Sequence, residues 1–138
     1  MSQYGTMLLR VTVGAIYLFQ AYLALFASTP GGTASFIATK AGLPTPTLLA
    51  LLVIAVHGVG GGMLVLGAWT RLAAAANGVI MLGGIVTVYL RQGVVIKGAI
   101  VDVAAGRATP PGYEYVLLLV VTTLAVASIG PGAWSLSR

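Results

Sequence analysis

His57 is the only histidine of the 138-residue chain, and it falls near the middle of a long apolar run at 48–67. An ionisable side chain at membrane depth is rare, and it marks a candidate functional site. Its imidazole could relay protons, form a hydrogen bond with a quinone-like head group, or ligate a haem or chlorophyll axially. The alternative, which we favour, is a neutral histidine hydrogen-bonded inside the protein, to Gln20 or to a backbone carbonyl.

Three further polar residues are expected on the same side of the membrane. Gln20 lies past the middle of the first apolar run, Tyr17 lies about one helical turn before it, and Tyr89 ends the third run. Because successive spans run in opposite directions, Gln20 and His57 should lie within about one turn of each other in depth. Together with His57 these residues are a candidate site for a lipophilic ligand. The simpler interpretation of the tyrosines is an aromatic belt at the membrane surface.

Other catalytic chemistry has no support in the sequence. The two carboxylates, Asp102 and Glu114, both lie in the connection at 91–114, and no catalytic triad, paired carboxylate or metal-ligand cluster occurs. The absence of cysteine excludes disulfides, Fe–S ligation and covalent haem within this chain. The net charge of +5 is spread over the chain without a basic cluster, which disfavours nucleic-acid binding. We expect no catalytic activity, no catalytic residue and no metal site.

The elements that position these residues are four apolar runs, at 6–27, 48–67, 72–90 and 115–133. Each is close to the roughly 20 residues with which a helix crosses the hydrocarbon core, and only 7% of the chain is charged. The sequence predicts one all-α domain over 1–138: an integral membrane bundle of four transmembrane helices, up-down-up-down. The first run is interpreted as a retained helix rather than a cleaved signal peptide. Both termini then share one side, and the two longer connections lie on the other.

The connections carry their own signals. A short helix is expected at 33–41, with Thr33 as its N-cap and Gly42 as its C-terminal stop. The turn at 68–71 makes the second and third helices antiparallel neighbours. The β-branched segments 94–96 and 100–103 favour a hairpin. This long connection is the expected partner-binding element, with the candidate contacts Val94, Lys97, Asp102 and Arg107.

Small residues are dense in the second and third runs. Such residues let helix backbones approach closely in a membrane, and we assign this packing role to Gly58, Gly61, Gly62, Gly78 and Gly83.

The chain resembles the DoxX family of small four-helix membrane proteins. The residues that carry the resemblance are Leu8-Leu9-Arg10 with Gly14, the stretch from Phe36 to Pro44, Gly60-Gly61-Gly62, Leu66-Gly67, Thr70-Arg71-Leu72, Gly112 to Tyr115 and Gly130 to Leu136. The resemblance implies a membrane subunit associated with redox systems, in the bacterial inner membrane, with both termini in the cytoplasm.

Two departures from the family pattern bear on function. Where members usually carry a glutamate before the glycines of the second helix, this chain has Val56-His57. Where they often carry His-Gly and then a lysine, it reads 20–24 as Gln-Ala-Tyr-Leu-Ala. The first hypothesis is therefore an accessory subunit of an electron-transfer assembly, with lipid and other integral membrane subunits as partners. The alternatives are a quinone-linked oxidoreductase component and a small-solute transporter. A quinone, haem or chlorophyll at His57 is the candidate cofactor contact.

Overall fold

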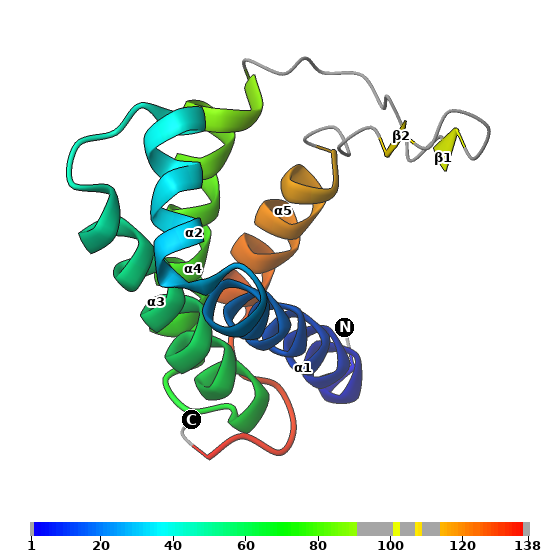
Figure 1. The fold of residues 1–138 in the computed structure, drawn as a ribbon. Coiled ribbons are helices and arrows are strands. Elements are labelled where there is room, and N and C mark those ends of the chain that lie inside the picture. The colour runs from blue at the N-terminus through cyan, green and yellow to red at the C-terminus, as the bar shows by residue number, and fades with distance from the viewer. Residues whose placement is uncertain (1, 91–100, 103–106, 109–113, 137–138) are drawn as a thin grey trace.

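Four long helices that alternate in direction make up most of the protein (Figure 1). A computed structural model describes residues 2–90, 101–102, 107–108 and 114–136. The helices are α1 (Gln3–Tyr22), α3 (Pro46–Leu66), α4 (Thr70–Gly84) and α5 (Glu114–Ile129). Two of them continue as π-helical segments, α1 into η1 (Leu23–Ala27) and α4 into η3 (Ile85–Tyr89). The predicted helical bundle is therefore confirmed, while its up-down-up-down arrangement as four membrane spans stays a prediction.

Three helical stretches, Gln3–Ala27, Pro46–Leu66 and Thr70–Val88, are long and apolar enough to cross a membrane. The fourth apolar helix, Tyr115–Ile129, is shorter. The 16 residues of α5 extend about 24 Å, against a hydrocarbon core of about 30 Å. Three candidate spans are therefore found by length and composition, and the fourth remains a prediction.

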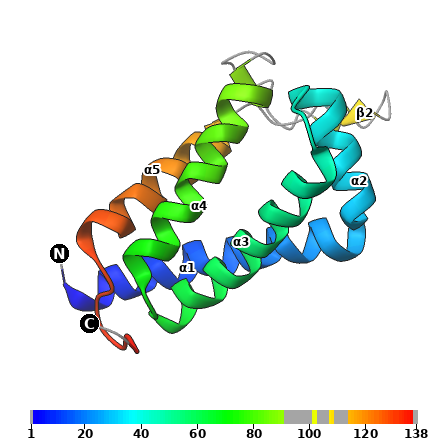
Figure 2. The same cartoon turned by 90° about the vertical axis from the view of Figure 1, so that its left-hand side faces the viewer.

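The predicted end of the fourth helix at residue 133 is wrong. The helix ends at Ile129 because Gly130 adopts φ +99° and Pro131 follows it. The chain then folds back, and the Ala133 amide donates to the Gln3 carbonyl at 3.1 Å. Figure 2 shows both chain ends at the same end of the bundle.

The first long connection is helical, but it begins earlier than predicted. It consists of α2 (Thr29–Phe36) and the π-helical η2 (Ile37–Ala41). Thr33 is not the N-cap, because it lies inside α2 and its hydroxyl donates to the Ala24 carbonyl at 3.2 Å. Gly42 does end the helix, in the left-handed conformation with φ +64°.

The second long connection contains a short antiparallel ladder of β1 (Val101–Asp102) and β2 (Arg107–Ala108). The predicted hairpin paired 100–103 with 94–96 instead. The segment 94–96 lies outside the described residues, and the strand that pairs with β1 is 107–108. The ladder is drawn away from the helices in Figure 1.

Helices α1 and α3 approach each other closely at two facing glycines. A Cβ built at Gly14 would lie 2.8 Å from the Gly61 carbonyl oxygen, and one at Gly61 would lie 2.9 Å from the Gly14 carbonyl oxygen. Of the glycines assigned to packing, Gly58 and Gly78 have ordinary neighbours at 3.6 Å. Gly62 and Gly83 show no such contact: among the described residues, no atom lies within 4 Å of a Cβ at either position.

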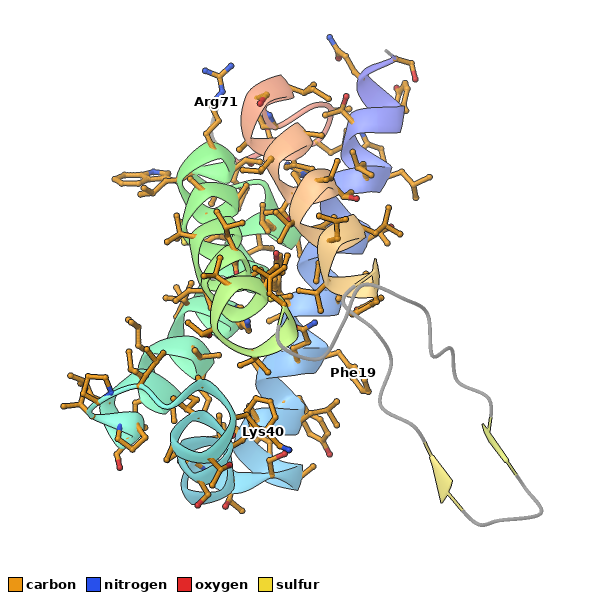
Figure 3. The ribbon with its side chains drawn as sticks, turned by 90° about the horizontal axis from the view of Figure 1, so that it is seen from above. Phe19, Lys40 and Arg71 are labelled. Atoms are coloured by element: carbon orange, nitrogen blue, oxygen red, sulfur yellow. The ribbon has the colours of Figure 1, made fainter. Side chains whose placement is uncertain are left out.

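The outer surface of the helices is apolar, as a lipid-facing surface requires. Figure 3 shows Phe19 projecting away from α1, and it is 61% exposed. The labelled cations Lys40 and Arg71 lie towards opposite ends of the protein in the same view. The core is formed by residues from all four long helices, among them Val13, Leu64, Ala74 and Val126.

Candidate functional site

His57 of α3 is buried between two neighbouring helices, α1 and α4. It is 4% exposed, and its Nδ1 lies 2.8 Å from Oδ1 of Asn77 on α4. The Tyr17 ring of α1 packs against the imidazole with a centroid separation of 5.0 Å. The hydrogen bond to Gln20 expected from the sequence is not what the structure shows, and Asn77 takes that role.

Asn77 is the site residue that sequence reasoning missed. It is fully buried, and its Nδ2 donates to the Ala73 carbonyl at 2.8 Å. Gly60 of α3 leaves the room for this amide, because a Cβ there would collide with Asn77 Nδ2. The sequence does contain an indication of it, because an asparagine inside an otherwise apolar run is a candidate site residue for the same reason as a histidine.

Tyr17 contacts His57 but does not line either of the cavities beside that residue. Its hydroxyl lies 2.8 Å from Oγ1 of Thr123 on α5. Because Thr123 Oγ1 donates its own proton to the Leu119 carbonyl at 2.6 Å, the Tyr17 hydroxyl is the donor of this bond. Tyr17 thus connects α1, α5 and the imidazole, which fixes the plane of the His57 ring.

Two adjoining cavities open beside His57. One, of about 430 Å³, is lined by residues of α1, η1, α2, α3, α4 and α5, including Gln20 and Tyr115. The other, of about 320 Å³, lies towards η2 and η3. They share the lining residues Thr33, Phe36, Val53, His57, Met81 and Gly84, and no charged side chain lines either of them.

The π-helical segments of the described chain surround these cavities. Leu23 and Ala24 of η1 line the first, while Ile37 of η2 and Val88 of η3 line the second. A π-helical turn is uncommon, and it occurs frequently at functional sites. The three segments together border the pair of cavities, which supports assigning this region as the functional site.

Of the other predicted residues, some lie at the cavities and some lie elsewhere in the chain. Gln20 lines the larger cavity. Tyr89 ends η3, and the placement of its side chain lies outside the description. Val94 and Lys97 lie outside the described residues, while Asp102 and Arg107 are paired in register across the β1–β2 ladder. Among the described residues, no group of three or more His, Cys, Asp or Glu could hold a metal ion.

Arg10 is a second buried polar centre. It is 1% exposed, and its Nη2 donates to the carbonyls of Ala133 and Trp134 at 3.3 and 3.1 Å. Its Nη1 occupies the space that a side chain at Gly67 would need. The guanidinium therefore packs against the α3–α4 turn while it holds the C-terminal segment by hydrogen bonds. The clue in the sequence is spacing, because Thr6, Arg10, Val13 and Tyr17 share one helical face.

Comparison with known proteins agrees with this architecture. No match is found among curated proteins or among solved structures. The DoxX family model matches residues 5–90, more than half of the chain, from α1 through the end of the third apolar helix. All of the described helices that line the cavities, except α5, fall within the match. This protein is therefore a small integral membrane protein that belongs to the DoxX family.

Proposed function

We propose that this protein binds a lipophilic molecule with a single polar head group in the cavities beside His57. The observation that carries the proposal is the lining: two joined apolar cavities with His57 and Gln20 among the few polar groups. Ligand sites are typically concave and apolar, with a small number of polar groups that fix orientation, and volumes of about 300–1,000 Å³ are common. Membrane quinones and related ring compounds with alkyl or isoprenoid tails have this chemistry.

The edges of the cavities favour entry from the bilayer. Leu23, Phe36 and Leu43 line them and are also exposed on the outer surface of the bundle, at 38–45%. Exposed apolar side chains at a cavity rim let a hydrophobic ligand pass from lipid without crossing water. Figure 2 shows α3 and α4 diverging away from the short turn that joins them, towards the end that carries η2 and η3.

Gly84 offers a direct test, because it lines both cavities and no described atom lies within 4 Å of a Cβ built there. Gly84→Leu should place its side chain in this space and reduce the volume open to a ligand. Gly62→Leu is the matched control, since Gly62 also has open space around it but lines neither cavity. The assay is equilibrium binding of a decyl-substituted benzoquinone, in its oxidised and in its reduced hydroquinone form, to the protein in lipid nanodiscs.

Saturable binding to the wild type and to Gly62→Leu, but not to Gly84→Leu, is the expected result. Binding that is equally strong in both variants would place the ligand elsewhere. If the wild type takes up no more of either form than empty nanodiscs do, this class of ligand is wrong.

We propose as a second function that the protein is an accessory subunit of a larger electron-transfer assembly. The resemblance of the chain to redox-associated membrane subunits supports it, as does the β1–β2 ladder drawn apart from the helices. Deleting residues 94–103 should leave membrane insertion intact and abolish co-purification of the partner from native membranes. Retention of the same partner after the deletion would place the contact on the helices.

The orientation that we propose places both termini in the cytoplasm of a bacterial cell, with α5 as the fourth span. Single cysteines replacing Ser2 and Ser137 should then resist a membrane-impermeant thiol reagent in intact cells and react after lysis. Labelling of only one of them in intact cells would remove the fourth span.

A further inference from the structure

We infer that the cavity selects ligands whose head group donates a hydrogen bond, such as a phenol, hydroquinone or alcohol, over ligands that offer only a carbonyl or ether. This inference rests on the proposed function and adds the chemical class of head group. It follows from the direction of the hydrogen bonds around His57, which can be assigned step by step from Ala73 to the cavity.

The orientation of the Asn77 amide follows from its contact with Ala73. The Ala73 carbonyl oxygen can only accept, so the amide group 2.8 Å from it must be the NH₂ of Asn77. The flipped amide would place two acceptors against each other at that distance, which is unfavourable in a buried site. Asn77 therefore presents its Oδ1, which also can only accept, to the histidine.

The proton of the His57 imidazole lies on Nδ1. Because Asn77 Oδ1 accepts, the Nδ1 of His57 that lies 2.8 Å away must carry a hydrogen. The residues lining both cavities are uncharged, and an ionised side chain without a counter-charge is costly at membrane depth. The neutral ring has one N–H, so Nε2 keeps its lone pair and is an acceptor.

Nε2 of His57 faces the cavities. No described residue makes a hydrogen bond with it. The fully buried side-chain N and O atoms without a partner in the described part of the chain are Nε and Nη1 of Arg10 and Oγ1 of Thr70. Since Nε2 has no partner and yet is not fully buried, it reaches open space, and His57 lines both cavities.

A hydroxyl head group satisfies this arrangement better than a carbonyl does. The hydroxyl can donate to Nε2 of His57 and accept from the amide of Gln20, which lines the larger cavity. A carbonyl or ether oxygen can accept from Gln20 but leaves Nε2 without a donor. A preference of at least about tenfold for the hydroxyl is expected, which corresponds to about 1.4 kcal/mol.

The proton position can be measured directly, because the chain has one histidine. Protein labelled with ¹⁵N-histidine in nanodiscs should show Nδ1 as the protonated nitrogen and Nε2 as the bare one. Addition of 4-decylphenol should shift the Nε2 resonance, whereas 4-decylanisole, in which a methyl ether replaces the hydroxyl, should leave it in place. A proton on Nε2 in the unliganded protein would overturn the inference.

Affinity separates this inference from the proposed function. The phenol should bind at least about tenfold more tightly than the ether, and both should lose binding in Gly84→Leu. Equal affinities that are both lost in Gly84→Leu would overturn the hydroxyl selection and leave the cavity as the binding site. No saturable binding of either compound would overturn both.

Discussion

Replacing glycine by alanine should destabilise the protein where α1 and α3 touch. The same replacement should not destabilise it at a neighbouring glycine that faces open space. A Cβ at Gly61 would lie 2.9 Å from the Gly14 carbonyl oxygen and from the Leu18 backbone nitrogen. Atoms in good contact are about 3.5–4.0 Å apart, so the two helices must separate by roughly half an ångström or more. Backbone atoms on both sides leave no flexible side chain to move instead.

The magnitude follows from two opposing effects. Overpacking costs about 1–3 kcal/mol. Replacing glycine by alanine inside a helix gains about 0.8–1.0 kcal/mol of helix propensity. The net change for Gly61→Ala is therefore a destabilisation of about 1 kcal/mol. In Gly62→Ala only the propensity term operates, because a Cβ there meets no described atom within 4 Å. The two variants should differ by about 2 kcal/mol although their mutations are adjacent.

Reversible unfolding in mixed micelles with increasing SDS, followed by far-UV circular dichroism, measures this difference. Gly14→Ala should behave like Gly61→Ala. The double variant should be less destabilised than the sum of the two singles, because one separation of the helices relieves both contacts. Equal unfolding midpoints for Gly61→Ala and Gly62→Ala would refute the close approach of α1 and α3 at this point.

Three further predictions concern single contacts. Arg10→Lys should speed hydrogen exchange at the Ala133 amide, measured by mass spectrometry, because lysine lacks the guanidinium whose Nη2 donates to two carbonyls of this segment, at 3.3 and 3.1 Å. Unchanged exchange would mean that other contacts hold the segment. Thr123→Val should lower the free energy of unfolding by about 1 kcal/mol, because it removes the buried hydrogen bond to Tyr17. The effect should vanish in a Tyr17→Phe background, where that bond is already absent, and additive effects would contradict this. Gly42→Ala should cost about 1 kcal/mol in the same unfolding assay, because alanine is strained at φ +64°, and a neutral effect would mean that η2 can end elsewhere.

Local pattern predicted the membrane helices well. Apolar runs and an almost complete lack of charge located three spanning stretches to within about three residues at each end. Gly42 was predicted as a helix end because a left-handed residue there favours glycine. These features depend on neighbouring residues in the chain, so the sequence alone determines them. It also singled out His57 as a buried ionisable group and Gln20 as a second polar residue lining the same cavity.

The partners of those residues were decided only by the tertiary structure. Asn77 rather than Gln20 bonds His57, and Arg10 is buried because the segment after Ile129 folds back over it. Both outcomes depend on how each helix is rotated about its axis and on how closely two backbones approach. In a membrane this rotation has no strong hydrophobic signal, because lipid is as apolar as the helix interior. Small residues such as Gly14, Gly60 and Gly61 set the approach, and only the folded chain shows which of its glycines face a neighbour.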